Sequence, residues 1–283
     1  TRPGGVRVRD VAIERPLDAL ASGAPLGIRV YEPPPQAGTS SGVILYFHGG
    51  GFALGDLDSH DTIVADLSAA TGLTAVAVDY ARVPEHQFPA ALQDARTAWL
   101  WLTSNTGEIT IDPHRIILAG DSCGATLAAN LALSAHHPSD QFNPAGQVLI
   151  YPVLGADFET SSYRANANAP NLTRAEMIAC WDAYLPLSRR EEVAKLAIPN
   201  RSEVPATLAP AAILTAAHDP VWDDGAVYAT RLGGNGIATA YRCDADLPHG
   251  HLRARREDPS AQRAFAWICQ ATRQLINGVR CGE

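Results

Sequence analysis

A serine lies between two glycines directly after the apolar run 115–119, and this arrangement constrains the fold more than any other part of the chain. The stretch reads Gly120-Asp121-Ser122-Cys123-Gly124. The apolar run predicts a buried strand, and the alanine-rich stretch 125–135 predicts a helix. Because so sharp a strand-to-helix turn strains its central residue and brings neighbouring chain close, the flanking positions have to be small. We therefore expect Ser122 at the tip of a strand–turn–helix.

Apolar runs and helical stretches alternate along most of the chain, a pattern that predicts an α/β fold with a mostly parallel central sheet and helices on both faces. Two N-terminal runs, 6–13 and 26–31, predict an antiparallel hairpin at the sheet edge. Further strands are expected at 43–47, 74–79, 115–119, 146–151, 211–216 and 238–243, and helices at 59–71, 90–104, 125–135 and 259–277.

The alternation of strands and helices breaks between about residues 153 and 201. No strand-like run occurs there; a polar loop at 161–171 is followed by a helical stretch that contains Met177 and Trp181. We expect this segment to be an inserted helical cap over the pocket. A chain of 283 residues has the size of one large domain, so we expect a single catalytic domain over 1–283 with this insertion.

Charge and cysteine usage narrow the class of protein. The formal net charge is −8 and no cluster of Lys and Arg offsets it, which argues against a nucleic-acid partner. The 5 cysteines are scattered and form no C-x-x-C pair, so neither a disulfide framework nor a zinc site is expected. No apolar stretch approaches the roughly 18 residues of a membrane helix, and no signal segment is visible. We expect a cytoplasmic protein with no integral membrane segment.

A serine hydroxyl attacks only if a nearby base takes its proton, and histidine suits that task when a carboxylate orients it. Two loops after the last predicted strands carry these groups. Asp219 follows strand 211–216 and His249 follows strand 238–243. We therefore assign Ser122 as nucleophile, His249 as base and Asp219 as acid.

The acid and the base each have a rival. Asp223 and Asp224 lie further from the strand end, and we expect them to cap the helix that begins near Asp224. His251 is two positions from His249, but Gly250 directly after His249 leaves room around its ring.

A glycine run directly after strand 43–47 can present backbone N–H groups to a negative oxygen. Glycines supply such donors without side chains in the way, so the stretch Gly49-Gly50-Gly51 is the candidate oxyanion loop. We expect His48 to orient this loop by hydrogen bonding. We expect the Cys123 side chain to be a small core residue and the Cys123 N–H to be a further donor.

Four stretches together resemble one family. They are His48-Gly49-Gly50-Gly51-Phe52, the segment 79–92, the turn at Ser122, and Asp219-Pro220 with His249-Gly250. In these motifs the chain resembles the hormone-sensitive-lipase-like carboxylesterases, bacterial family IV of the α/β-hydrolase superfamily. The resemblance implies an α/β-hydrolase fold, oxyanion donors at the N–H groups of Gly50, Gly51 and Cys123, and a cap that shapes the acyl and alcohol pockets.

The chain departs from the family pattern in places that concern substrate preference. Cys123 and Ala125 stand where the family has alanine and glycine, and His251 stands where an aromatic residue usually follows His-Gly. Only about 40 residues precede strand 43–47, whereas the family normally has N-terminal helices that complete the cap, so we expect an open pocket. The candidate substrate-binding residues are Phe52, Leu54, Trp181, Tyr184, Val221 and Trp222.

The function expected from these observations is a serine carboxylesterase that hydrolyses small, short-acyl esters through an acyl-enzyme, with no metal or cofactor. The partner is a small-molecule ester, and a homodimer is left open. The same machinery would serve a deacetylase or amidase of a specialised metabolite. A non-catalytic ligand-binding protein, as in the gibberellin receptors of the family, is disfavoured because those proteins lack a working base whereas His249 is present.

Overall fold

The computed structural model describes residues 1–16, 24–34, 42–104, 109, 111–134 and 143–278. Within these residues the centre is one 8-stranded sheet in the order β1-β2-β4-β3-β5-β6-β7-β8. Its strands are β1 (Arg7–Ile13), β2 (Leu26–Glu32), β3 (Val43–Phe47), β4 (Thr74–Val78), β5 (Ile116–Asp121), β6 (Gly146–Ile150), β7 (Ala211–His218) and β8 (Thr239–Pro248).

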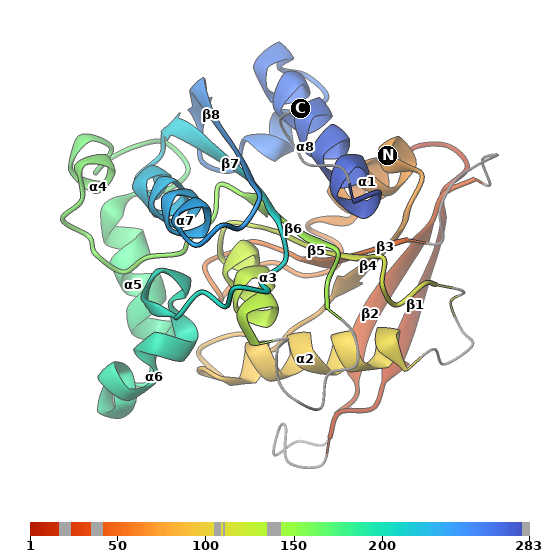
Figure 1. Ribbon diagram of the computed structural model, residues 1–283, viewed down its shortest axis with the longest axis horizontal. Coiled ribbons are helices and arrows are strands. Elements are labelled where there is room, and N and C mark those ends of the chain that lie inside the picture. Colours follow the sequence, from red (N-terminus) through yellow and green to blue (C-terminus); the bar gives the residue numbers. More distant parts are fainter. Residues whose placement is uncertain (17–23, 35–41, 105–108, 110, 135–142, 279–283) are drawn as a thin grey trace.

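The sheet has an antiparallel edge and a parallel body. β1 pairs with β2 and β2 with β4 in antiparallel register, while all strand pairs from β4–β3 to β7–β8 are parallel. The predicted N-terminal hairpin and α/β fold class are therefore confirmed. Figure 1 shows the two antiparallel strands at one edge and β7 and β8 at the other.

Helices cover both faces of the sheet (Figure 1). α1 (Asp61–Thr71) and α8 (Pro259–Ile276) pack on one face; α2 (Ala90–Thr103), α3 (Cys123–Ser134) and α7 (Trp222–Gly234) pack on the other. In β3 the alternate residues Val43, Leu45 and Phe47 join the core on the α3 side, and Ile44 and Tyr46 join the core on the α1 side. This strand is apolar at every position because both of its faces are buried.

The insertion between β6 and β7 is helical. It contains α4 (Ser161–Ala165), α5 (Arg174–Tyr184), η1 (Leu187–Arg189), α6 (Arg190–Ala197) and η2 (Pro199–Arg201). A capping box between Thr173 and Glu176 starts α5. The short helix α4 lies in the stretch expected to be a polar loop, so that part of the prediction was wrong. α4 packs against α7 and α6 against α3, which places the insertion beside the α3 face (Figure 1).

The expectation that Asp223 and Asp224 cap their own helix was wrong. α7 begins at Trp222 and has no side-chain cap. Asp224 Oδ2 instead accepts hydrogen bonds from the N–H groups of Leu154 and Gly155, at 3.1 and 2.8 Å. Asp223 Oδ2 accepts from Ser162 N at 2.8 Å. Both carboxylates therefore bind the insertion to α7.

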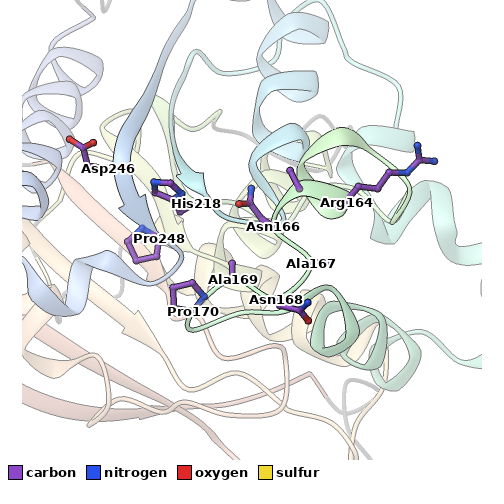
Figure 2. Close-up of a pocket in the computed structure, with 10 residues that line it drawn as sticks. Arg164, Asn166, Ala167, Asn168, Ala169, Pro170, His218, Asp246 and Pro248 are labelled. Atoms are coloured by element: carbon purple, nitrogen blue, oxygen red, sulfur yellow. The ribbon is translucent and has the colours of Figure 1, made fainter.

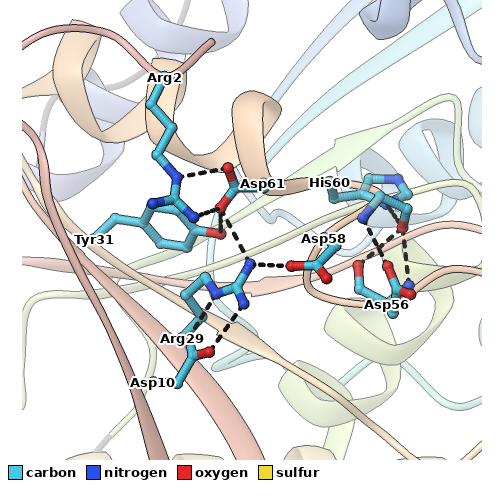
Figure 3. A network of polar contacts seen from close by, with 9 residues as sticks. Arg2, Asp10, Arg29, Tyr31, Asp56, Asp58, His60 and Asp61 are labelled. Carbon is cyan, nitrogen blue, oxygen red and sulfur yellow. Dashed lines mark hydrogen bonds and ion pairs between the residues drawn. The ribbon is translucent and has the colours of Figure 1, made fainter.

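A polar network fastens the N-terminal hairpin to the start of α1 (Figure 3). Arg29 on β2 binds Asp10 at 2.6 Å and Asp58 at 2.7 Å, and Arg2 binds Asp61 at 2.6 Å. Because these contacts join residues that are far apart in the sequence, they fix the chain just before α1, where His60 lies.

Two further sequence expectations concern cysteines and membrane segments. Cys123, Cys180, Cys243 and Cys269 are free thiols, and Cys281 lies outside the described residues. Among the residues described, none of the helices has both the length and the apolar character needed to cross a bilayer.

Helix α3 starts against the end of β3. A Cβ atom at Gly124 would lie 2.1 Å from the Phe47 carbonyl oxygen and 2.5 Å from that of His48. Both neighbours are backbone atoms, so they cannot turn aside as a flexible side chain would. The glycine is therefore required for the close approach of α3 to β3.

We expect Gly124→Ala to lower the free energy of unfolding by about 1–3 kcal/mol, because the added methyl group overpacks a backbone contact. Urea denaturation followed by circular dichroism measures the loss. Gly233→Ala in α7 is the matched control, since a Cβ atom there meets nothing within 4 Å. The control should be as stable as the parent or more so. An unchanged urea midpoint for Gly124→Ala would contradict the prediction.

Candidate active site

Ser122 lies at a strained turn between β5 and α3. Its φ is +55°, in the left-handed region that non-glycine residues rarely adopt. Backbone hydrogen bonds hold this conformation: Ser122 N donates to Ile150 O at 2.9 Å, and Ser122 O accepts from Val153 N at 3.3 Å. The predicted strand–turn–helix is therefore present, and neighbouring backbone at the end of β6 maintains its strain.

The structure brings Ser122, His249 and Asp219 together. His249 Nε2 lies 2.8 Å from Ser122 Oγ, and His249 Nδ1 lies 2.6 Å from Asp219 Oδ2. Asp219 is fully buried, and its other carboxylate oxygen accepts from Val221 N at 3.0 Å. This chain of contacts can take a proton from the serine and hold the imidazole in one orientation.

The ends of two strands were longer than the sequence indicated. β7 extends to His218 rather than 216, and β8 to Pro248 rather than 243. Asp219 and His249 therefore follow their strands immediately. Since parallel strands end at one edge of the sheet, their positions at the carboxyl ends of β7 and β8 bring them near Ser122 at the end of β5.

The rival base His251 has another arrangement. Its Nδ1 lies 3.0 Å from Pro248 O, and its ring makes an edge contact with Tyr151. Burial lowers the pKa of His251, which disfavours its charged form. Of the two histidines, His249 is the one in hydrogen-bond contact with Ser122.

The glycine loop lies in the same cavity as Ser122. Gly50 and Gly51 have φ values of +133° and +62°. A Cβ atom at Gly50 would lie 2.1 Å from Leu54 O, because Gly50 O accepts from the N–H groups of Ala53 and Leu54 in a tight turn. Gly50 therefore cannot carry a side chain in this loop, which lines the cavity together with the nucleophile.

Asp121 is a buried carboxylate that sequence reasoning did not single out. It accepts hydrogen bonds from Tyr46 Oη at 2.8 Å, Gly49 N at 2.9 Å and Tyr151 Oη at 3.3 Å, and His60 Nε2 is 3.4 Å away. Burial acts to raise its pKa, but His60 and the hydrogen bonds hold the pKa of Asp121 below its usual range. An acidic residue at the end of a fully buried strand is the sequence signal that could have identified it.

The side chains of His48 and Cys123 contact the backbone at the two ends of the glycine loop. His48 Nδ1 lies 2.9 Å from Gly49 O, the ring stacks on Tyr80, and burial lowers the pKa of His48 to about 4. Cys123 Sγ accepts from Phe52 N at 3.2 Å, and burial raises the pKa of this thiol to about 12. The histidine is therefore neutral, and the cysteine is a protonated core residue.

A cavity of about 790 Å³ opens at Ser122 and His249. Leu54 lines it, as the sequence indicated, and the insertion contributes Leu172, Glu176 and Cys180. Among the described residues, no group of three or more His, Cys, Asp or Glu could hold a metal ion.

The other candidate pocket residues do not line this cavity. Phe52, Trp181 and Tyr184 form a buried aromatic cluster in which the rings of Phe52 and Tyr184 stack at 3.8 Å. Val221 is buried, and Trp222 Nε1 donates to Tyr241 Oη. On α5, Cys180 faces the cavity and its neighbour Trp181 faces the core, because consecutive helical residues point about 100° apart.

Comparisons with known proteins identify the family of this chain. A family model described as "alpha/beta hydrolase fold" matches residues 44–253. The chain is 35% identical to esterase LipI of Mycobacterium tuberculosis, over 96% of this chain and 83% of that protein. It is 31% identical to ethyl acetate hydrolase of Pseudomonas putida, over 90% of this chain and 80% of that protein.

Similarity extends to solved structures. The esterase of the archaeon Pyrobaculum calidifontis superposes with a TM-score of 0.87 and 30% identity, covering 97% of this chain and 87% of that one. The sequence motifs, the sheet order and these relatives all indicate the same family. The chain belongs to the α/β-hydrolase-fold family, in the group of hormone-sensitive-lipase-like carboxylesterases.

Proposed function

We propose that this carboxylic ester hydrolase cleaves small, short-acyl esters through a covalent intermediate on Ser122. The observation that carries the proposal is the continuous contact from Ser122 Oγ to His249 Nε2 at 2.8 Å and from His249 Nδ1 to Asp219 Oδ2 at 2.6 Å. Each group has the chemistry its role needs, and each lies within hydrogen-bond reach of the next.

In the proposed reaction Ser122 Oγ attacks the ester carbonyl carbon while its proton moves to His249 Nε2. The tetrahedral intermediate collapses, the C–O bond to the alcohol breaks, and His249 returns the proton to the leaving alcohol. Water then attacks the acyl-enzyme, gives its proton to His249, and releases the carboxylic acid as Ser122 recovers its proton. Asp219 stays ionised and stabilises the imidazolium formed in both halves.

The developing oxyanion is proposed to accept hydrogen bonds from the N–H groups of Gly50, Gly51 and Cys123. Gly49 N already donates to Asp121, which fixes the beginning of the loop. At the other end of the loop Phe52 N donates to Cys123 Sγ, a weaker hydrogen bond because sulfur is a poor acceptor. The donors between these two anchors are preorganised, so no reorganisation is needed as charge develops.

The small-ester preference has two supports. One relative is named for ethyl acetate, a small ester. The cavity is also bordered by the acidic residues Glu176, Asp246 and Asp258, whose carboxylates are unfavourable neighbours for an extended acyl chain. Leu54, 73% exposed at the mouth, is the proposed substrate contact among the predicted set. We propose that Phe52, Trp181 and Tyr184 do not contact the substrate but pack behind the residues that line the cavity.

The remaining expectations stay predictions. They are a single catalytic domain over 1–283 with residues 153–201 as its cap, catalysis without metal or cofactor, and a cytoplasmic location. Amide hydrolysis at the same site also stays a prediction, and a matched anilide measured beside each ester tests it.

Ser122→Ala should lower kcat for p-nitrophenyl acetate by at least about a thousandfold, because no other group forms the acyl-enzyme. Ser134→Ala, at the far end of α3, is the matched control and should keep full activity. Thermal unfolding checks that both variants are folded. A fluorophosphonate probe should label the parent at Ser122 and leave Ser122→Ala unlabelled. Retained turnover in folded Ser122→Ala would contradict the proposed mechanism.

Cys123→Ala should keep its kcat within about threefold, because sulfur is a weak acceptor and the proposed donor is the backbone N–H. Steady-state kinetics on p-nitrophenyl acetate measures the change. A much larger loss in a variant with the parent's melting temperature would assign the side chain a direct role and disprove this account.

A series of p-nitrophenyl esters from acetate through butyrate and octanoate to decanoate should give the highest kcat/KM among the short chains. Each further methylene group that stays in water contributes none of the about 0.8 kcal/mol of binding free energy that its burial would give. Ser122→Ala serves as the blank for spontaneous hydrolysis. A maximum at octanoate or decanoate would reject the short-acyl preference and leave the Ser122 mechanism intact.

A further inference from the structure

The loop 166–171 joins α4 to α5 and lies against the ends of β7 and β8 (Figure 2). In this view Asn166 lies near His218, and Pro170 lies near Pro248. The loop borders two cavities. Asn171 lines the cavity at Ser122, and Asn166 and Asn168 line a second cavity of about 520 Å³ on the other side.

Asn166 contacts the chain that carries Asp219. Its Nδ2 donates to Ala217 O at 3.1 Å and to Asp219 O at 3.2 Å. One turn earlier, the buried Ser162 Oγ donates to Pro220 O at 2.7 Å. Side chains of α4 and the loop thus donate hydrogen bonds to three carbonyl groups of this chain, those of Ala217, Asp219 and Pro220.

Asn171 contacts the chain that carries His249. Its Nδ2 donates to His249 O at 3.0 Å. Its φ is +69°, in the left-handed region where asparagine is better tolerated than most residues. The backbone conformation therefore favours asparagine here, and the amide anchors the residue that contacts Ser122.

Backbone hydrogen bonds stabilise the conformation of the loop. Ala169 N donates to Asn166 O at 3.0 Å, and Arg174 N donates to Ala167 O at 3.0 Å. These bonds tie both ends of the loop to its middle and to the start of α5. A loop closed in this way can hold two neighbouring segments in a fixed relation.

We propose that Asn166 and Asn171 are positioning residues that set the relative placement of Asp219 and His249. The proposal rests on the proposed Ser122–His249–Asp219 mechanism. The 2.6 Å contact between Asp219 and His249 joins two loops that follow two different strands. The loop 166–171 donates a hydrogen bond to the main-chain carbonyl group of each of these residues. Small displacements of catalytic groups cost large factors in rate, so a shared anchor serves the chemistry.

The test uses two amide deletions and one control. Asn166→Ala removes the donor to Asp219 O, and Asn171→Gly removes the donor to His249 O while allowing the left-handed backbone. Asn168→Ala is the matched control, because this exposed residue lies in the same loop and, among the described residues, its side chain makes no hydrogen bond to the chains that carry Asp219 and His249. Kinetics on short and long p-nitrophenyl esters, fluorophosphonate labelling rates and melting temperatures are measured for each.

Each amide deletion should lower kcat about tenfold, by the same factor for every ester, with little change in KM. The labelling rate of Ser122 should fall in parallel, because labelling needs the base but not the ester pocket. The double variant should lose less than the product of the two factors, since both amides act through one contact. Asn168→Ala should match the parent.

Three results would overturn the proposal: unchanged kcat in both deletions, losses that follow the acyl chain or KM, or an equal loss in Asn168→Ala. The second result would make the asparagines substrate contacts, and the third would make the loop a general stability element. Failure of the mechanism itself is recognised separately, by activity retained in Ser122→Ala. If Ser122→Ala is inactive, the results for the Asn166 and Asn171 variants test the positioning proposal alone.

Discussion

The buried carboxylate of Asp121 is the group on which the arrangement around Ser122 depends. A charge removed from water has to be compensated by hydrogen bonds or by an opposite charge. Asp121 accepts hydrogen bonds from Tyr46 on β3, Gly49 in the glycine loop and Tyr151 after β6, and His60 before α1 lies 3.4 Å away. The Asp121 carboxylate, one residue before the nucleophile, thus fixes several segments of the chain around Ser122. The network around Arg2 and Arg29 fixes the segment before α1 from the outer side (Figure 3).

The insertion is joined to the sheet by polar contacts as well as by packing. Asp223 and Asp224 bind its backbone from α7, while Asn166 and Asn171 bind the backbone of Asp219 and His249 from the insertion. The segment that borders the substrate cavity therefore shares its anchors with the proposed catalytic groups. Changes in this segment can alter both the shape of the cavity and the rate of the chemistry.

Sequence reasoning succeeded where the signal was local. The run Val43–Phe47 is apolar at every position because both faces are buried, and the turn at Ser122 requires glycine at a fixed place. It failed at the end of β8, where Asp244 and Asp246 stand in a strand at the sheet edge. Polar residues are tolerated there because one side of the strand is partly exposed, so the sequence reads as a loop.

The sequence by itself determined the α/β fold, the identity of Ser122, Asp219 and His249 as candidates, and the glycine loop, because each follows from a short pattern after a buried strand. Only the tertiary structure showed that His249, and not its rival His251, is in hydrogen-bond contact with Ser122. It also gave Asp223 and Asp224 their partners and turned Cys180 rather than Trp181 toward the cavity. These choices depend on contacts between segments dozens of residues apart, which local spacing does not encode.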